Sequence, residues 1–210
     1  MIKRPMPKLF LDERFNHKHL DDRLQWLNPP AQWRVDLEAS ALIVEPDAST
    51  DFWRKTHYGF EADNGHLLWT PVEGDFVMTA NVRFHPVHQY DQAGLMVRLD
   101  ENCWLKTSVE YELLEPAKLG VVVTNAGYSD WSLQDFDKNG NEIWLRVSRS
   151  GNDCMVDFST EGDAWTPLRV AHLHGTSSVV QCGVYACSPK GAGFRAEFRR
   201  LEIETLKDSL

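Results

Sequence analysis

Apolar and polar residues alternate along much of the chain after residue 33, which is the period-two pattern of a β-strand with one buried face. In GDFVMTANVRF (74–84), every second residue from Phe76 to Phe84 is apolar. The alternation recurs in seven further segments, 93–99, 104–111, 118–124, 142–150, 153–160, 180–187 and 194–204. Turn signals separate several of them, namely Asn139-Gly140, Ser150-Gly151-Asn152 and Glu161-Gly162-Asp163. The pattern predicts an all-β chain.

Many short strands at fairly even spacing, without a long helical pattern between them, are typical of a two-sheet antiparallel sandwich of jelly-roll type. A closed barrel is the alternative. We expect a single domain over residues 1–210, because a chain of 210 residues can bury one sizeable core. Residues 1–30 are expected to be a partly strand-forming lead-in, and STDFWRKTHYGF (49–60) a loop or short helical turn across one end of the sandwich.

Two strand-like runs, 92–99 and 104–111, flank the polar segment DENC and predict a hairpin. Directly opposed residues of a hairpin project to the same side of the sheet. If Ala93, Leu95, Val97 and Leu99 face the core, the expected outward pairs are Arg98 with Trp104, Met96 with Lys106, Gly94 with Ser108, and Gln92 with Glu110. The outward face would then be a floor with a shallow trough at Gly94 and Ser108, bordered by aromatic and charged groups.

Such a face suits a sugar, whose carbon face can lie on the Trp104 indole while its hydroxyls exchange hydrogen bonds with amide, carboxylate and guanidinium groups. The alternative is ordinary solvated sheet surface, stabilised by cross-strand pairs such as Arg98 on Trp104.

Charge and composition limit the classes of partner that we expect the chain to bind. The chain has 22 lysines and arginines against 31 acidic residues, a formal charge of -9, and no long basic run. We therefore expect no nucleic-acid partner. The amino terminus lacks the apolar stretch of a signal sequence, and no apolar run approaches the roughly 18 to 20 residues that span a bilayer. These features predict an uncleaved, soluble, cytoplasmic protein without a membrane partner.

Four motifs taken together resemble the concanavalin A-like proteins named after regulation of enolase protein 1, a family of largely uncharacterised function. They are TDFWRKTHYGFEADNGH (50–66), GDF from residue 74, YDQAGLMVRLDENCWLK (90–106) and VVVTNAGYSDWS (121–132). The likeness runs from about Trp26 to Ile203. It implies a concanavalin A-like jelly roll related to lectins and glucanases, in which the concave outer face of one sheet usually holds the ligand. It implies much less about activity.

The resemblance also points to individual residues, which are Trp53, His57, Asp63, Asn64, His66, Asp91, Gln92, Trp104, Lys106, Asp130 and Trp131. Arg98 and Glu110 share the outward face of the hairpin with several of them. We expect this hairpin to form the centre of a site for a small saccharide or sugar derivative. Hydrogen bonds would come from Gln92, Arg98, Lys106 and Glu110, stacking from Trp104, and a rim from Trp53, His57 and Trp131. The ligand would be phosphorylated or acidic if Arg98 and Lys106 converge on it.

Two other functions stay open. One is a carbohydrate-active enzyme that uses Glu110, Lys106 or His57 as acid or base. Laminarinase-type relatives place paired carboxylates along one strand, but here Ser108 stands at the first position, and Glu110 and Glu112 remain. The other is a protein-binding regulator of a metabolic enzyme such as enolase, which the family name suggests.

No cofactor is expected, although a structural calcium ion stays open. Three histidine pairs, 17/19, 85/88 and 172/174, have no obvious third ligand nearby in sequence. The loop DFDKNGNEIWLR (135–146) begins like a calcium loop, but Arg146 occupies the position that needs a bidentate glutamate. The four cysteines lack the spacing of a zinc clamp, so we expect reduced and mostly buried thiols.

Overall fold

A computed structural model describes residues 6–137 and 141–207, and the Asn139-Gly140 turn lies outside them. The described residues form strands joined by turns and loops: β1 (Met6–Glu13), β2 (Gln25–Leu27), β3 (Gln32–Asp36), β4 (Ala41–Glu45), β5 (Phe52–Trp53), β6 (Ala62–Asp63), β7 (His66–Glu73), β8 (Asp75–His85), β9 (Gln92–Asp100), β10 (Cys103–Glu110), β11 (Ala117–Asn125), β12 (Tyr128–Phe136), β13 (Glu142–Ser150), β14 (Asp153–Ser159), β15 (Thr166–His172), β16 (Val179–Cys187) and β17 (Arg195–Lys207). Within this part of the chain there is no helix of the length and apolar character that a membrane crossing requires.

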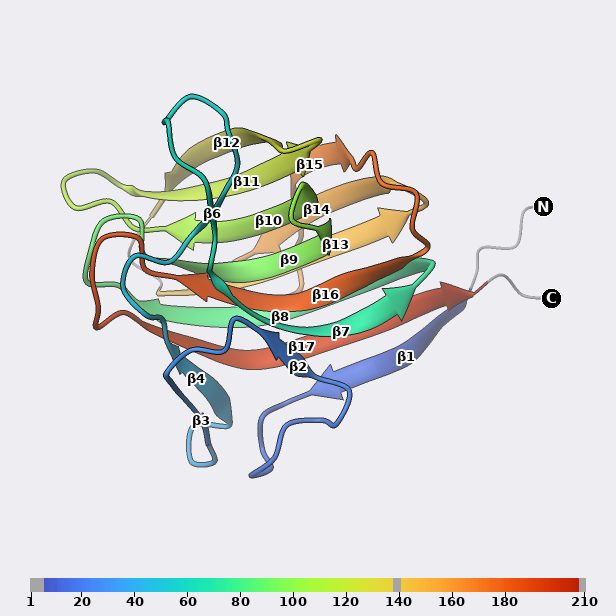
Figure 1. The fold of residues 1–210 in the computed structure, drawn as a ribbon. Helices are drawn as coiled ribbons and strands as arrows, with labels where there is room; N and C mark the ends of the chain where they lie inside the picture. Colours follow the sequence, from blue (N-terminus) through green and yellow to red (C-terminus); the bar gives the residue numbers. More distant parts are fainter. Residues whose placement is uncertain (1–5, 138–140, 208–210) are drawn as a thin grey trace.

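Two large antiparallel sheets face each other (Figure 1). The eight-stranded sheet has the order β15-β14-β13-β8-β17-β4-β3, with β1 added on β17. The seven-stranded sheet has the order β12-β11-β10-β9-β16-β7-β2, and β5 and β6 pair separately. The prediction of an all-β, two-sheet, jelly-roll-like sandwich is therefore confirmed. The lead-in forms strands as expected, because β1 pairs with β17 and β2 with β7.

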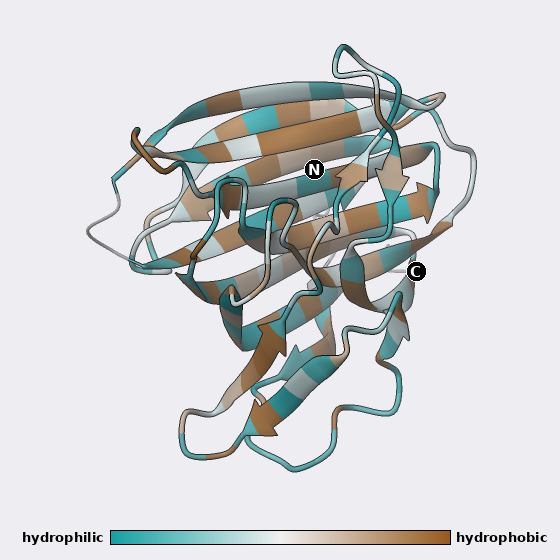
Figure 2. Ribbon diagram, turned by 60° about the vertical axis from the view of Figure 1, so that its left-hand side comes forward, coloured by the Kyte–Doolittle hydropathy of each residue, from teal (hydrophilic) through white to brown (hydrophobic). Residues whose placement is uncertain are grey.

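The main core lies between the two sheets and is built by the period-two alternation. Phe76, Met78 and Val82 of β8 meet Leu95 and Val97 of β9 there, and all five side chains are fully buried. Figure 2 shows the corresponding apolar and polar bands along the strands. The four cysteines are free and buried, as predicted.

The β9–β10 hairpin has the register that the sequence predicts. The outward pairs are Arg98–Trp104, Met96–Lys106, Gly94–Ser108 and Gln92–Glu110. On the core side, Val97 opposes Leu105 and Ala93 opposes Val109. Face parity alone therefore placed these side chains on the correct side of the sheet.

The segment 49–60 differs from the prediction of a loop or helical turn at one end of the sandwich. It contains β5, which pairs with β6, and in Figure 1 β6 lies in front of β9 and β10. The reason is visible in the packing: Phe52 of β5 contacts the rings of Trp104 and Tyr185 on the outer face of the seven-stranded sheet. Residues 49–65, which we call the β5–β6 segment, thus cover part of this outer face.

Candidate functional site

The outer face of the seven-stranded sheet carries a second apolar cluster, separate from the main core. Its buried members are Phe52, Trp53, Leu67, Met96, Trp104, Val122, Tyr185 and Cys187. Strands β7, β9, β10, β11 and β16 supply the floor of this cluster, and β5 supplies its cover. The face that the alternation predicts to point away from the core is therefore largely closed to solvent.

Three contacts fix the β5–β6 segment on this face. Phe52 packs edge-on against Trp104, with ring centroids 6.3 Å apart. Two guanidinium nitrogens of Arg98 donate to the two carboxylate oxygens of Asp63 at 2.8 and 2.9 Å. The Lys106 ammonium donates to Asp51 Oδ1 at 3.0 Å. Because the two cations are nearly buried, these ion pairs hold the cover in one position.

A pocket of about 360 Å³ remains beside the cover. Volumes of this size are typical of small-molecule sites. The pocket is lined by Asp51, Trp53, Tyr58, Phe60, Tyr90, Gln92, Lys106, Glu110, Val122, Trp131 and Lys190. Its residues come from the β5–β6 segment, from the strands β9 to β12 and the loop before β9, and from the loop after β16.

Hydrogen bonds connect the polar groups on the pocket floor. Lys106 Nζ donates to Asp51 Oδ1 and, at 2.9 Å, to Gln92 Oε1. Gln92 Nε2 donates to Glu110 Oε2 at 3.1 Å. The Tyr185 hydroxyl lies 3.1 Å from Gln92 Oε1 and 2.7 Å from Ser108 Oγ. Gln92 therefore bridges the cationic and the carboxylic side of the floor, and its amide is held from both ends.

Three polar groups on this floor keep hydrogen-bonding capacity. Among the described residues, one ammonium hydrogen of Lys106, Asp51 Oδ2 and Glu110 Oε1 have no hydrogen-bond partner. Burial raises the pKa of Glu110 to about 8; the Lys106 cation opposes this rise, whereas the charges of Asp51 and Glu112 add to it. At neutral pH the Glu110 side chain is therefore mainly a carboxylic acid that can donate a hydrogen bond.

Aromatic side chains form the pocket walls. Trp53 and Tyr58 have ring centroids 5.2 Å apart, and Phe60 lies 6.4 Å from Tyr58. The Trp53 indole nitrogen donates to the Thr56 carbonyl at 2.9 Å, which orients the ring. Trp131 enters from β12. A Cβ atom on Gly120, in the neighbouring strand β11, would lie 2.9 Å from the Trp131 indole nitrogen. Glycine at 120 therefore makes room for this tryptophan.

Four of the eight non-glycine residues with positive φ in the described part of the chain lie in the loops that contribute lining residues to the pocket. Ser49, Lys55, His57 and Tyr90 adopt positive φ angles of 63°, 35°, 64° and 71°. Non-glycine residues rarely adopt this conformation, and such strain tends to occur at functional sites. The loops before β5, between β5 and β6, and before β9 are therefore held in shapes that their own residue types do not favour.

Five residues expected at the site line the pocket: Trp53, Gln92, Lys106, Glu110 and Trp131. The other five do not. Trp104 is fully buried beneath Phe52, so the prediction that its indole offers a stacking surface to a sugar is wrong. Arg98 is buried and bound to Asp63, so it does not converge with Lys106 on a ligand. The trough at Gly94 and Ser108 is filled by Tyr185, which pairs with Gly94.

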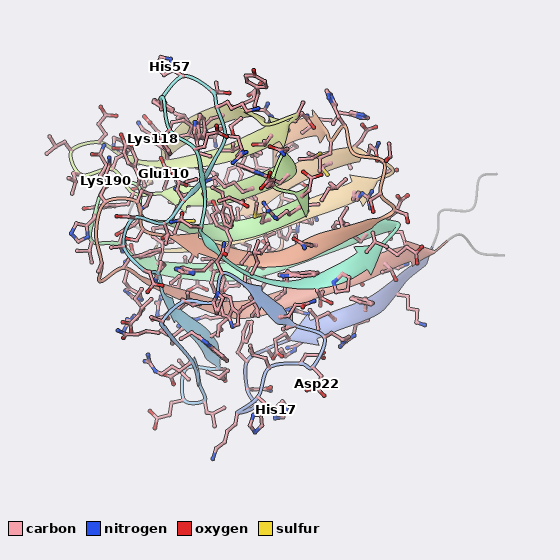
Figure 3. The ribbon with its side chains drawn as sticks, viewed as in Figure 1. His17, Asp22, His57, Glu110, Lys118 and Lys190 are labelled. Carbon is pink, nitrogen blue, oxygen red and sulfur yellow. The ribbon has the colours of Figure 1, made fainter. Side chains whose placement is uncertain are left out.

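Asp91, Asp130 and His57 have other surroundings. Asp91 is buried and accepts hydrogen bonds from the amides of Val87 and His88, which fixes the turn before β9. Asp130 is exposed and pairs with Arg169 of β15 at 2.9 Å. His57 sits at the tip of its loop, away from Glu110 (Figure 3), with its ring 4.9 Å from that of Tyr58. None of the three is placed to touch a ligand in the pocket.

Six lining residues were not predicted as ligand contacts, namely Asp51, Tyr58, Phe60, Tyr90, Val122 and Lys190. Five of them had a signal, because Asp51, Tyr58 and Phe60 belong to the motif at 50–66, Tyr90 to the motif at 90–106 and Val122 to the motif at 121–132. Lys190 had none. It follows β16 in a glycine-containing turn, and only the fold brings it to the pocket.

The positions of Glu110, Glu112 and the metal-ligating residue types bear on the predictions of glycoside hydrolysis and metal binding. Strand β10 ends at Glu110, and Glu112 beyond it accepts a hydrogen bond from Gln89 at 2.7 Å and does not line the pocket. A pair of carboxylates facing one bond is therefore not provided by Glu110 and Glu112. In residues 6–137 and 141–207, no group of three or more histidine, cysteine, aspartate or glutamate side chains is arranged to hold a metal ion.

Comparisons with known proteins agree with the sequence resemblance. A family model described as protein of unknown function (DUF1349) matches residues 26–206. Regulation of enolase protein 1 of Saccharomyces cerevisiae is 39% identical over 175 residues, which are 82% of this chain and 85% of that protein. The crystal structure of a functionally unknown S. cerevisiae protein, 33% identical, has a TM-score of 0.81 and covers 89% of this chain and 98% of that chain.

A more distant likeness concerns the fold alone. The structure of a xylan β-1,4-xylosidase from Bacillus halodurans C-125 has a TM-score of 0.74 at 14% identity. The match covers 97% of this chain but 41% of that chain. A putative β-xylosidase of Escherichia coli is 24% identical over 166 residues, which are 68% of this chain and 31% of that protein. Most of each xylosidase therefore lies outside the shared sandwich.

Proposed function

The chain belongs to the family of proteins of unknown function DUF1349, and we propose that the pocket beside its β5–β6 segment binds a small neutral saccharide. The observation that carries this proposal is the pocket floor. There, Lys106 offers a donor, Asp51 an acceptor and Glu110 a group that can do both, beneath walls of tryptophan, tyrosine and phenylalanine. Adjacent hydroxyls of a sugar both donate and accept, while its C–H face packs on aromatic rings.

The charge of the floor favours a neutral ligand over a phosphorylated one. The Lys106 cation is balanced by Asp51, and Glu110 is mainly uncharged at neutral pH. Arg98, the second cation considered for a phosphate, is engaged by Asp63. A phosphate group placed over Lys106 would therefore meet the Asp51 carboxylate, and Lys190, the other cation in the pocket lining, lies 5.6 Å from the Tyr90 ring centroid.

The relatives support the choice of a sugar only through their names. The B. halodurans and E. coli proteins are described as xylosidases, and this chain shares their sandwich fold. We therefore include pentoses and their oligomers among the candidate ligands. We also propose a cytoplasmic location, which the free cysteines of this chain support because such thiols persist in a reducing compartment.

A thermal-shift screen tests the saccharide proposal, since a ligand that prefers the folded state raises its melting temperature. The panel would contain pentoses, hexoses, polyols and short oligosaccharides. At least one should stabilise the parent protein, and the shift should disappear in Trp131→Ala. The matched control is Trp165→Ala, because Trp165 stacks on Arg146 of the other sheet, 4.1 Å from its ring centroid. No shift across the panel, or an undiminished shift in Trp131→Ala, would contradict the proposal.

Catalysis in the same pocket is a second candidate function, favoured by the Glu110 pKa of about 8. A carboxylic acid that titrates near neutral pH can both give and take a proton. Chromatography of each stabilising sugar after incubation with the protein separates the two functions. Binding of a sugar without chemical change identifies a recognition protein. Turnover that is lost in Glu110→Gln, with the thermal shift retained, identifies an enzyme.

Regulation of a metabolic enzyme rests on the name of the yeast relative. Co-purification of enolase with the tagged chain tests it directly. If enolase is retained by the parent protein and equally by Trp131→Ala, the pocket and the protein-binding surface are different sites. If no enolase is retained at micromolar concentration, this alternative fails.

A further inference from the structure

A second hollow adjoins the pocket across Phe60. It has a volume of about 510 Å³ and is more open than the pocket. It is lined by Ser49, Asp51, Phe60, Glu61, Ala62, Asp63, Asn64, Pro189 and Lys190, and we call it the outer hollow. Three of these residues, Asp51, Phe60 and Lys190, also line the pocket. The two spaces therefore meet at a shared border.

We propose that the pocket and the outer hollow hold neighbouring units of one saccharide chain, so that the preferred ligand is a disaccharide or longer oligosaccharide. This inference rests on the proposed saccharide-binding function and extends it by a second subsite. The first unit lies on Lys106, Glu110 and Trp131, and the second lies beyond Phe60.

The shared border has the chemistry that a glycosidic linkage needs. Phe60 is 46% exposed and stands between the two spaces, so its ring offers apolar surface to a sugar on either side. Asp51 is held by Lys106 through Oδ1, while Oδ2 can accept from a hydroxyl next to the linkage. Lys190 lies 5.6 Å from the Tyr90 ring centroid and adds a donor at the same border.

The walls of the outer hollow are fixed and largely charge-balanced. The Glu61 carboxylate pairs with Arg54 at 3.0 Å, and Asp63 pairs with Arg98. Asn64 donates to the Ser49 carbonyl at 2.9 Å and accepts from the Asp51 amide at 3.0 Å. An uncharged sugar ring can therefore enter without displacing either ion pair.

The two spaces also differ in a way that fits a chain with one recognised end. The pocket has a hydrogen-bonded floor formed by the sheet, and it is the more enclosed of the two. The outer hollow is bordered by loop and edge residues and opens to solvent. The terminal unit is therefore expected in the pocket, and further units extend outward from the outer hollow.

Isothermal titration with xylose, xylobiose and xylotriose, and with glucose and cellobiose, tests the second subsite. In the sugar series that binds, the disaccharide should bind about tenfold more tightly than the monosaccharide, a factor that corresponds to about 1.4 kcal/mol. The third unit should add little. Ala62→Trp, which fills the outer hollow, should abolish the gain while leaving monosaccharide affinity unchanged; Ala62→Ser is the matched control.

Glu61→Trp provides an independent obstruction from another position on the same wall. Circular dichroism and the melting temperature show whether each variant is folded. Equal affinity of mono- and disaccharide overturns the second subsite but leaves the proposed function intact. A disaccharide gain that survives both tryptophan variants overturns the assignment to the outer hollow. Failure of every sugar to bind overturns the proposed function together with the inference.

Discussion

The outer faces of the two sheets arise from the same alternation of residues but differ in how far they are exposed to solvent. On the eight-stranded sheet, Arg146 of β13 pairs with Asp157 of β14 at 3.0 Å, and the Arg146 side chain is 28% exposed. On the seven-stranded sheet, Lys106 and Arg98 also pair with carboxylates, but their side chains are only 5% and 8% exposed. The difference is the cover: the β5–β6 segment lies over Lys106 and Arg98, whereas Arg146, 4.1 Å from the Trp165 ring centroid, stays more exposed.

This difference shows where the chain carries interactions that stability alone does not require. Burying a charged pair costs desolvation energy that the attraction only partly offsets, so a covered ion pair is weak support for stability. On the seven-stranded sheet the cover also leaves a pocket with unused donors and acceptors. We interpret the covered face as the functional one and the open face as a solvated exterior.

The largest effect should come from removing the anchor of the cover. Phe52 is fully buried against Trp104 and Tyr185, and Phe52→Ala should lower the free energy of unfolding by about 4 kcal/mol, because it leaves a cavity. Met155→Ala on the open face, where Met155 is 53% exposed, should change it by at most about 0.5 kcal/mol. Urea denaturation measures both. Similar small losses would show that Phe52 does not anchor the cover.

Breaking the covered ion pair should be the next largest change. Lys106→Met leaves Asp51 without its cation in a poorly solvated site and should cost about 3 kcal/mol. Arg146→Met, the matched change on the open face, should cost about 1 kcal/mol or less. Equal costs in urea denaturation would contradict the distinction between a covered and an open face.

Glu110 should give the covered face a pH dependence of the opposite sign to an ordinary surface carboxylate. Its pKa is raised from 4.5 to about 8 by burial, so the native state retains a proton that the unfolded state has lost between these values. Stability relative to Glu110→Gln should therefore be greatest below about pH 4.5 and fall as the pH rises to about 8. The change should be on the order of 2 kcal/mol once partial solvent access is allowed for.

Urea denaturation of the parent and of Glu110→Gln across pH 4 to 9 measures this difference. Glu142→Gln, at the eight-stranded sheet, is the matched substitution for comparison. A parent that gains stability relative to Glu110→Gln as the pH rises would reverse the sign and exclude a raised pKa.

The smallest expected effect concerns a single hydroxyl. Tyr185→Phe removes the group that contacts Gln92 and Ser108 and should cost about 1 kcal/mol. Tyr128→Phe, at a position that is 62% exposed, should be nearly neutral. If both variants melt like the parent, the hydroxyl of Tyr185 does not support the pocket floor.

The sequence predicted the sandwich and the hairpin register because both follow from local alternation and face parity. It also placed Lys106, Gln92 and Glu110 on the correct face. It did not predict that Trp104 and Arg98 on that face are buried, since alternation says which side chains point away from the core and not what lies above them. Phe52, Asp51 and Asp63 close the face from positions 35 to 55 residues away in the chain from the groups that they contact. Lys190 approaches the pocket from still farther away, through the pairing of β16 with β9.

The central claim is that the covered face, and not the open one, receives a saccharide. The most direct measurement is a nitrogen-edited NMR titration of the tryptophan indole signals, assigned by substitution, with the best ligand of the sugar panel. We expect the signals of Trp131 and Trp53 to shift, while those of Trp144 and Trp165, at the eight-stranded sheet, stay in place. Unmoved signals from Trp131 and Trp53, or shifts confined to Trp144 and Trp165, would contradict the account.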